Sequence, residues 1–358
     1  MTKRICFLIG DIGLSGGTER VSSLIANLLA EDGHQLYMLS ISGGKQAFFP
    51  LHEQVELHQL FDQKVSMKKN FFACCFKIRK FVQQHKIDHL IVVDSISCVF
   101  TVPALIGLHH VQHICWEHFN FNVDLGVSFR RLGRKWAAKY CDTIVTLTER
   151  DKLLWEKGLK HIKAKIIPIA NPSPYENIQH LPSLEHKVIL SLGRLTAIKG
   201  FDRLITAWAW VCKQNDDWTL RIVGSGEDEE QLKQQAKDLA INDRIEFIAA
   251  TKNVDQYYRT CSFYCLSSRS EGLPMVLIEA QAYGLPIVSM DCDTGPAEII
   301  QNGENGFLCH SVEDLAEGLF RATKMDQQQY QHMVQSSQNN VLRFDSNNIM
   351  GFWRKVLE

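Results

Sequence analysis

The sequence predicts an α/β fold with two doubly wound parallel sheets. At 358 residues the chain is long enough for about two domains of roughly 150 residues each. Short β-branched runs alternate with amphipathic stretches along both halves of the chain, which is typical of repeated strand–helix–strand units. A segment at 171–185 holds three of the nine prolines and has neither the alternation of a strand nor the periodicity of a helix. We therefore expect an N-terminal domain over residues 1–172, a linker over 173–185 and a C-terminal domain over 186–358.

The expected strands are continuous apolar runs, which indicates strands buried on both faces. In the first domain they lie at residues 4–10, 35–41, 88–94, 112–116 and 142–147, and in the second at 187–192, 219–223, 244–248, 262–266 and 286–289. Beyond residue 311 the pattern is helical to the end, and the last helix could pack back on the N-terminal domain. Open parallel sheets bind ligands beyond the carboxyl ends of their strands, so two facing sheets predict a site in a central cleft.

Composition excludes several classes of protein. Apolar residues make up 45% of the chain and charged residues 22%, which excludes disordered, collagen-like and coiled-coil proteins. We expect a cytoplasmic protein, because no apolar run reaches the roughly 18–20 residues that span a bilayer and the first apolar stretch is too brief for a secretory signal. The 11 cysteines lack the C-x-x-C spacing of zinc or redox centres, and we expect thiols that act as small buried hydrophobes. The close pairs are Cys74 with Cys75 and Cys261 with Cys265.

Charge is divided unequally between the two halves. Residues 1–170 carry a net charge of +7 and the remainder −8. We therefore expect the N-terminal half to contact an anionic partner, which could be nucleic acid, a phosphorylated metabolite or a membrane surface. Cations alternate with aromatic residues at 64–82 and 129–139, and on helices such stretches suit an anionic lipid surface. The alternative is that these helices pack their aromatic residues inward and leave the cations in water. Nucleic acid is not expected, since no recognisable nucleic-acid-binding module is present.

Three strand-to-helix loops of the expected sheets contain glycine or paired cations. The loop over residues 10–20 has Gly16 and Gly17 before a helix, which favours an anion or forms a simple tight turn. The loop that starts at Gly193 contains Arg194 and Lys199, which together could neutralise a diphosphate without a metal. Gly224 marks a third loop of the same kind, and the three loops favour a ligand the size of a nucleotide.

Two carboxylates flank a predicted helix start in the most informative segment, residues 267–284. Pro274 suits the first turn of that helix and Gly284 its end, so Glu271 precedes the helix and Glu279 lies on it. Backbone N–H groups near 272–275 favour phosphate, whereas carboxylates repel phosphate and bind hydroxyl groups. One carboxylate could therefore accept the hydroxyls of a ribose and the other those of a sugar. Ordinary surface charge is the alternative explanation of two glutamates.

These segments together resemble the retaining family 4 glycosyltransferases of GT-B fold. The resemblance rests on the glycine pair near the N-terminus, on Gly-Arg-Leu followed by Lys-Gly, and on Glu-Gly-Leu-Pro-Met-Val-Leu-Ile-Glu-Ala with its eight-residue Glu-to-Glu spacing. Ala-Tyr-Gly-Leu-Pro-Ile-Val-Ser and Gly-Pro-Ala-Glu-Ile-Ile are also similar to that family. The match follows the chain in order and is loose over residues 40–110. It implies a GT-B fold of two Rossmann-like domains that face a cleft.

The resemblance also implies a role for each matched position. Arg194 and Lys199 would hold the donor diphosphate, Glu279 the ribose and Glu271 the hydroxyls of the donor sugar. The donor site would further include Gly193, Gly224, Gly272, Leu273 and Pro274, and Gly16 with Gly17 would shape the acceptor side. His118 matches a histidine that faces the donor sugar, although a histidine beside aromatic residues can also be purely structural. The chain departs from the family at 248–251, where relatives often carry a glycine, which puts the nucleobase contact there in doubt.

The expected activity is transfer of a hexose or N-acetylhexosamine from a UDP-sugar to a glycan, with retention at the anomeric carbon. Bacterial surface-polysaccharide enzymes (O-antigen, capsule or lipopolysaccharide) with lipid-linked acceptors are the most similar members, which implies attachment to the inner face of the cytoplasmic membrane. The alternatives are a sugar-nucleotide epimerase or hydrolase, and a non-catalytic scaffold that binds sugar nucleotides. Asp291 and Asp293 resemble a metal-binding D-x-D motif. Because the rest of the sequence resembles GT-B enzymes, in which fixed cations stabilise the leaving diphosphate, we expect no essential metal and no cofactor.

Overall fold

A computed structural model of the chain describes residues 2–124 and 126–358. The chain divides into two compact units. One comprises the chain up to Pro172 together with Ser346–Glu358, and the other comprises Ser173–Asp345. The sequence also places a division after residue 172. The structure differs from the predicted linker, because it groups residues 173–185 with the second unit. The last helix belongs to the first unit, which is the packing that the sequence analysis named as an option.

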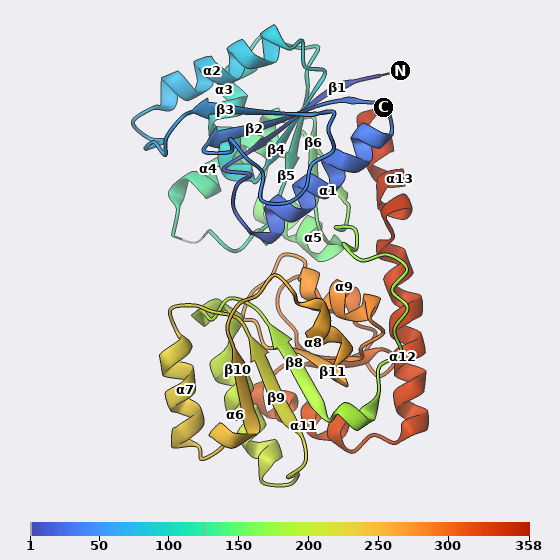
Figure 1. Ribbon diagram of the computed structural model, residues 1–358. Helices are drawn as coiled ribbons and strands as arrows, with labels where there is room; N and C mark the ends of the chain where they lie inside the picture. The colour runs from blue at the N-terminus through green and yellow to red at the C-terminus, as the bar shows by residue number, and fades with distance from the viewer. Residues whose placement is uncertain (1, 125) are drawn as a thin grey trace. The chain divides into compact units, whose positions relative to one another are not determined.

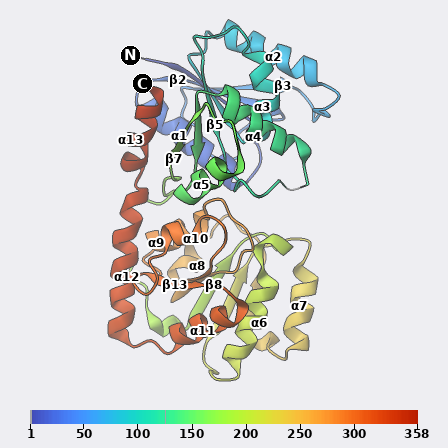
Figure 2. The same cartoon turned by 180° about the vertical axis from the view of Figure 1, so that it is seen from behind.

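The first unit is a seven-stranded parallel sheet covered by helices on both faces. Its strand order is β3-β2-β1-β4-β5-β6-β7, and every neighbouring pair is parallel. Helices α2, α3 and α4 cover one face and α1 lies on the other (Figures 1 and 2). In chain order the unit contains β1 (Arg4–Ile9), α1 (Gly17–Glu31), β2 (Gln35–Ser42), β3 (Val55–Phe61), α2 (Phe71–Gln84), β4 (His89–Val93), η1 (Ser95–Ser97), α3 (Cys98–Ala104), β5 (Gln112–Trp116), α4 (Ser128–Tyr140), β6 (Thr143–Thr146), α5 (Glu149–Gly158), β7 (Lys165–Pro168) and α13 (Ser346–Leu357).

The second unit is a six-stranded parallel sheet of order β10-β9-β8-β11-β12-β13. Helices α6, α7 and α11 cover one face, and α8 and α9 lie on the other (Figures 1 and 2). The unit contains η2 (Leu184–His186), β8 (Val188–Leu192), η3 (Ala197–Lys199), α6 (Phe201–Cys212), β9 (Thr219–Val223), α7 (Glu229–Asp238), η4 (Asn242–Arg244), β10 (Ile245–Ile248), α8 (Asp255–Arg259), β11 (Phe263–Leu266), α9 (Met275–Ala282), β12 (Ile287–Met290), α10 (Pro296–Ile299), β13 (Gly306–Cys309), α11 (Val312–Thr323), α12 (Gln327–Val341) and η5 (Leu342–Phe344).

Helix boundaries follow local sequence signals. Ser311 and Asp326 cap α11 and α12 by accepting hydrogen bonds from backbone N–H groups three residues on. Helix α9 begins after Pro274, and Gly284, at φ +74°, follows its end. The predicted start and end of this helix are therefore confirmed, because a left-handed residue costs least when it is glycine.

Helix α13 belongs to the first unit because it fills the apolar face beside β5. Trp353 is fully buried and its ring packs edge-on against that of Trp116, with the centroids 4.9 Å apart. Arg354 forms an ion pair with Asp32 at the end of α1, with an Nε–Oδ2 distance of 2.8 Å. The amphipathic pattern predicted a helix here, but a buried tryptophan fits either core, so the sequence left open which unit it covers.

All ten predicted strands are present, and three further strands, β3, β7 and β13, are strands that the sequence analysis missed. All three lie at an edge of their sheet. Edge strands pair on one side only and need no continuous apolar run. Strand β3 carries polar residues at three of its seven positions, and β7 and β13 have only four residues each. Their sequence signal was therefore too weak.

Two expectations from the sequence, buried thiols and the absence of a membrane-spanning helix, can be compared with the structure. All 11 cysteines are free thiols, and eight of them are buried. Both close pairs lie in or beside the apolar cores of the two units. In the part of the chain that the structure describes, no helix has both the length and the apolar character needed to cross a membrane.

Candidate functional site

Glycines let three loops of the second unit lie against one another. Strands β8, β9 and β11 are parallel neighbours, so the loops that follow them leave the same edge of the sheet. A Cβ atom on Gly224 would lie 1.8 Å from the carbonyl oxygen of Gly193, and one on Gly200 would lie 2.2 Å from that of Ser267. Gly200 also has a φ of +66°. Gly224 and Gly200 are therefore required for close packing of the loops, whatever ligand binds there.

The centre of this loop cluster is an ion pair between Lys199 and Glu271. Lys199 Nζ donates to Glu271 Oε1 at 2.7 Å, and Ser268 Oγ donates to the same oxygen at 2.6 Å. The Glu271 side chain is only 10% exposed, whereas that of Lys199 is 31% exposed. Thr294 Oγ1 donates to the backbone carbonyl of Glu271 at 2.6 Å. The structure therefore fixes the carboxylate and leaves part of the cation open to a ligand.

Arg194 lies on the same loop but has no comparable partner. Its side chain is exposed, and it makes no side-chain hydrogen bond within residues 2–124 and 126–358. The neighbouring Arg269, which the sequence analysis missed, donates to both carboxylate oxygens of Asp202 at 2.6–2.7 Å and to the carbonyl of Ala197 at 2.6 Å. Arg269 therefore holds the loop in place, and it lowers the pKa of Asp202. Arg194 remains available for an anion.

The segment before α9 offers mainly backbone groups. Leu273 is buried, so its side chain supports packing, and Gly272 and Pro274 complete the turn into the helix. Gly295, at φ +100°, packs against this turn, because a Cβ on it would lie 2.5 Å from Pro274 Cδ. The turn is thus held from both sides at the start of an eight-residue helix, where backbone N–H groups favour negative charge.

Glu279 has a different partner from Glu271. Tyr258, which the sequence analysis did not name, donates its hydroxyl to Glu279 Oε2 at 2.9 Å, and the glutamate is only 5% exposed. The ring of Tyr258 is fully buried and stacks on that of Tyr283, with the centroids 5.0 Å apart. Burial and the nearby Glu279 charge raise the pKa of Tyr258 well above its usual value. The phenol therefore stays protonated and holds the carboxylate in one orientation.

Two further predicted features lie near these loops. At 248–251, the carbonyl of Ile248 accepts from Gly224 N at 2.8 Å, and Ala250 N donates to Ser225 Oγ at 3.1 Å. This segment is therefore joined to the Gly224 loop without the family's glycine. Asp291 and Asp293 follow β12, and His310 Nδ1 lies 4.0 Å from Asp291 Oδ2. Within the described residues, neither belongs to a group of three side chains that could hold a metal ion.

In the first unit, Gly16 caps α1 and Gly17 is its first residue. A Cβ on Gly17 would meet open space, whereas one on Gly16 would lie 2.2 Å from a carboxylate oxygen of Glu19. Burial raises the pKa of Glu19, and the charge of Asp11 on the same loop adds to this effect. Two acidic groups that the sequence analysis missed therefore flank the helix start. They oppose a phosphate there and suit the hydroxyl groups of an acceptor.

His118 follows β5, and its imidazole lies against Trp116 with the ring centroids 4.4 Å apart. Burial lowers the pKa of His118 to about 3, so the ring is neutral at physiological pH. Its Nε2 atom is buried and has no hydrogen-bond partner in the described part of the chain. A buried polar atom without a partner is costly, and a ligand that bonds to it is one explanation for its presence. The ligand-facing role of His118 remains a prediction that this atom supports.

A buried arginine fixes the loop that carries His118. Arg134 on α4 donates to the carbonyls of Asn120, Phe121 and Val123 at 2.5–3.1 Å, and its Nε donates to Glu117 Oε2 at 3.1 Å. These donors satisfy the backbone of an irregular segment that has no sheet partner. The sequence signal for this role was an arginine on a helix, which is uninformative by itself.

The same contacts correct the predicted lipid-binding face at 129–139. Arg130 is 5% exposed and pairs with Asp94 at 2.9 Å, and Arg134 is 2% exposed. Both cations therefore neutralise buried carboxylates of their own unit and cannot face a lipid surface. Only Arg131, Lys135 and Lys139 are exposed cations on α4. For Arg130 and Arg134 the membrane interpretation was wrong, because an internal ion pair offsets the cost of burial.

Asp151 provides a pH test of this buried network. Its carboxylate accepts from Phe121 N at 2.7 Å, and burial raises its pKa to about 7, with a further contribution from Glu117. Because the folded pKa exceeds the unfolded one, the folded state holds a proton that the unfolded state releases. Asp151 therefore lowers stability as pH rises from about 4 to about 7. We expect Asp151→Asn to reduce this loss by a few kcal/mol at most, measured as unfolding free energies in denaturant at pH 5 and pH 8. An unchanged pH dependence would contradict the assignment.

Two family models match the chain, one over each half. The family model described as Glycosyltransferase Family 4 matches residues 15–171, and the model described as Glycosyl transferases group 1 matches residues 176–340. An uncharacterized glycosyltransferase of Haemophilus influenzae is 44% identical over 319 residues, which cover 88% of this chain and 89% of that protein. The chain belongs to the family 4 glycosyltransferases.

Other relatives of this glycosyltransferase have more specific names. The amylovoran biosynthesis glycosyltransferase AmsD of Erwinia amylovora is 28% identical, and the match covers 99% of each chain. An α-1,4-N-acetyl-D-galactosaminyltransferase of Campylobacter jejuni is 25% identical, and the match covers 99% of this chain and 98% of that protein. Its name gives the acceptor as a GalNAc-containing glycan on PP-undecaprenol.

Solved structures show that the fold of this glycosyltransferase is GT-B. The lipopolysaccharide outer core galactosyltransferase WaaB, in its apo form, has a TM-score of 0.79 at 20% identity. Anabaena HepE in complex with UDP and glucose has a TM-score of 0.79 at 19% identity. Each comparison covers 99% of both chains. The predicted fold class, family and enzyme class are thus confirmed.

Proposed function

We propose that this glycosyltransferase moves a hexose or N-acetylhexosamine from a UDP-sugar to a lipid-linked glycan, with retention at the anomeric carbon, in the synthesis of a bacterial surface polysaccharide. The observation that carries the proposal is the Lys199–Glu271 pair beside the exposed Arg194, on loops that leave one edge of the second sheet. The complex of HepE with UDP and glucose supports the donor class. The name of the Campylobacter relative supports the acceptor class.

The roles follow from the chemistry of each group. Transfer breaks the bond between the anomeric carbon and the diphosphate and forms one to an acceptor hydroxyl, whose proton is released. Negative charge grows on the diphosphate as its bond breaks, and Lys199 and Arg194 would stabilise that charge. Glu271, held by Ser268 and Lys199, would accept hydrogen bonds from the donor sugar. The neutral His118 would act as a hydrogen-bond partner of the sugar and not as a charge.

A screen of nucleotide sugars tests the proposal. The enzyme is incubated with UDP-GalNAc, UDP-Gal, UDP-GlcNAc and UDP-Glc, with and without lipid-linked oligosaccharide acceptors, and the products are followed by mass spectrometry and by NMR of the new anomeric centre. We expect UDP release that depends on the acceptor. We also expect the product to keep the axial configuration that the anomeric carbon has in the UDP-sugar. Release of UDP without an acceptor would indicate a hydrolase. Conversion of the sugar nucleotide to another sugar nucleotide would indicate an epimerase. If no nucleotide sugar is changed, the protein is a scaffold. EDTA is expected to leave transfer largely intact, because no metal is assigned to the leaving group.

The face by which the enzyme would reach a lipid-linked acceptor lies on α2. Phe72 and Phe76, one turn apart, are 84% and 67% exposed, and the exposed Lys80 follows one turn later on the same side of the helix. Lys69 is exposed in the turn that precedes the helix. Exposed aromatic residues beside cations suit the interface of an anionic bilayer. We therefore place the proposed membrane contact on this α2 face, and not on the buried arginines of α4.

Liposome sedimentation measures this contact. We expect binding to anionic but not to zwitterionic vesicles, with salt weakening it, since each cation contributes about 1 kcal/mol near an anionic surface. Replacing Phe72 and Phe76 with serine and Lys69 and Lys80 with glutamate should abolish binding. The matched control changes Lys213 and Lys237, exposed cations of the second unit, to glutamate. Equal loss in both variants would show that net charge alone decides binding.

A further inference from the structure

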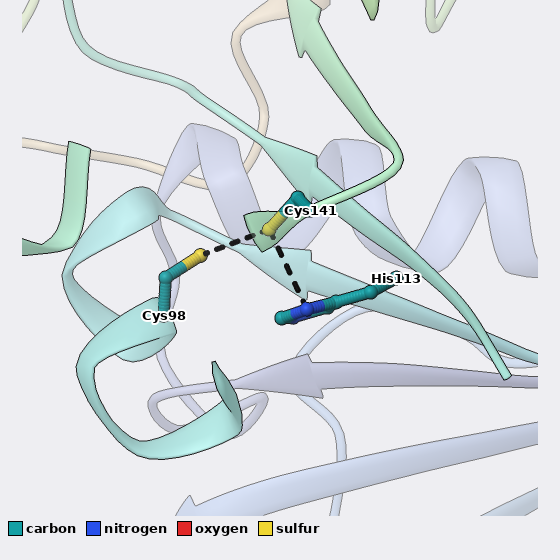
Figure 3. A group of neighbouring side chains, drawn as sticks. All are labelled: Cys98, His113 and Cys141. Atoms are coloured by element: carbon teal, nitrogen blue, oxygen red, sulfur yellow. Dashed lines mark hydrogen bonds between the residues drawn. The ribbon is translucent and has the colours of Figure 1, made fainter. Parts of the chain in front are cut away.

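A cluster of thiols and one imidazole lies in the core of the first unit and contains none of the residues assigned to sugar transfer. Cys98 begins α3, His113 lies on β5, and Cys141 follows α4 (Figure 3). Cys98 is fully buried, and His113 and Cys141 are each 4% exposed. Their side chains converge although 43 residues separate the two cysteines. The spacing gave no sign of this cluster, because none of these residues forms a C-x-x-C pair.

The distances in the cluster match those between neighbouring ligands of one metal ion. The Sγ atoms of Cys98 and Cys141 are 4.0 Å apart, and Cys141 Sγ lies 3.5 Å from His113 Nδ1 (Figure 3). Within the described chain, the donor atoms of all three residues lie within 4.8 Å of one another. A tetrahedral zinc ion, with bonds of about 2.3 Å to sulfur and about 2.0 Å to nitrogen, holds neighbouring ligands roughly 3.3–3.8 Å apart. The Cys98–Cys141 and Cys141–His113 distances therefore lie within a few tenths of an ångström of that range.

Thr101 sets the orientation that a metal-binding histidine needs. Its Oγ1 atom lies 2.9 Å from His113 Nε2. An Nε2–H that donates to this oxygen leaves the lone pair of Nδ1 for the side of the ring where Cys141 Sγ lies, 3.5 Å away. An imidazole that ligates a metal usually donates its other N–H to an oxygen in this way.

Cys115 is the proposed fourth donor. It lies two residues after His113 on β5, so its side chain is on the same face of the sheet. Its sulfur lies outside the group of donor atoms that are within 4.8 Å of one another, so it would turn toward the ion on binding. Three cysteines and one histidine form a common ligand set of structural zinc sites. Thiols alone are weak hydrogen-bond partners for a buried imidazole, whereas an ion bound to all four would satisfy every polar atom.

We propose that Cys98, His113 and Cys141, with Cys115 as the fourth ligand, bind one structural zinc ion in the core of the first unit. The surrounding side chains are apolar, among them Leu90, Val92 and Ile144. A site closed by four protein ligands has no open position for a substrate, so the ion would stabilise the fold and take no part in sugar transfer. The ion would join α3, β5 and the end of α4, which are far apart in the sequence.

Metal analysis of the full-length untagged enzyme tests the proposal. We expect about one zinc per chain by mass spectrometry after growth with zinc. Growth with cobalt should give the charge-transfer and d–d absorption of a tetrahedral thiolate–cobalt centre. Cys98→Ser, Cys141→Ser and His113→Gln should each lose the metal and lower the melting temperature. Cys75→Ser is the matched control, because Cys75 is a half-buried thiol of the same unit outside the cluster.

The wild-type measurements decide the question even if the variants fail to fold. Absence of both stoichiometric zinc and the cobalt spectrum would overturn the proposal. Metal that persists in Cys98→Ser and Cys141→Ser would also overturn it. A count of nine thiols in the denatured protein, with a mapped bond between Cys98 and Cys141, would show that the pair is instead oxidised to a disulfide.

Discussion

Replacing Lys199 with alanine is expected to lower kcat/KM for sugar transfer by about 10²- to 10³-fold, the usual loss when one donor to developing charge is removed. Two effects act in the same direction. The leaving diphosphate loses a cation, and the nearly buried Glu271 carboxylate loses the ammonium that lies 2.7 Å away. Steady-state kinetics with the donor identified by the screen measures the change, and Lys199→Arg should retain more activity because it keeps the charge.

Lys187 provides the matched control for Lys199. It is also an ion-paired lysine of the second unit, with Asp217 as its partner, but it precedes β8 and therefore lies at the opposite end of that strand from Lys199. Lys187→Ala should leave transfer unchanged. Arg194→Ala should reduce transfer without lowering the melting temperature, because its exposed side chain supports no described contact. Full activity in both Lys199→Ala and Arg194→Ala would refute the donor-site assignment.

The two glutamates are expected to affect different steps. Glu279→Gln should weaken binding of free UDP by about 10- to 100-fold, since it is assigned to the ribose and a hydrogen bond to a charged group contributes about 1.5–3 kcal/mol. Glu271→Gln should leave UDP affinity nearly unchanged and impair transfer, because the donor sugar is absent from UDP. Isothermal titration calorimetry with UDP and kinetics with the UDP-sugar separate the two effects.

Tyr258→Phe is the control for the Glu279 assignment. It removes the hydroxyl that donates to Glu279 Oε2 and leaves the carboxylate in place. We expect a smaller loss of UDP affinity than in Glu279→Gln, because the carboxylate can still accept from the ribose but is less well oriented. Equal losses of UDP affinity in Glu271→Gln and Glu279→Gln would show that the division of roles is wrong. Thermal unfolding of each variant separates a loss of affinity from a loss of fold.

Much of the fold could be predicted because its strands are buried on both faces. Such strands are continuous apolar runs, and local signals such as Pro274 and Gly284 mark where helices begin and end. Prediction failed at the sheet edges, where β3, β7 and β13 pair on one side only. For α13 the sequence named packing on the N-terminal domain only as an option, since an amphipathic helix shows that it has a partner but not which one.

For the site, the sequence predicted residue types and their loops but not their partners. Arg194, Lys199, Glu271 and Glu279 were identified from motifs whose spacing is fixed by one loop or one helix. Tyr258, Arg269 and Arg134 had no such local signal, because each acts on a residue of a different segment. The basic stretch at 129–139 was misread for Arg130 and Arg134 for the same reason: their carboxylate partners are distant in the sequence.

The sequence by itself determined the α/β class, the two parallel sheets, the glycine-containing strand-to-helix loops and the family, because these depend on periodicity and on motifs confined to short segments. Only the tertiary structure decided which charges are paired, which unit α13 completes, and that Cys98, His113 and Cys141 meet. The physical reason is that parallel strands joined by helices bring together residues that are tens of positions apart. Contacts of that kind leave no pattern in the local sequence.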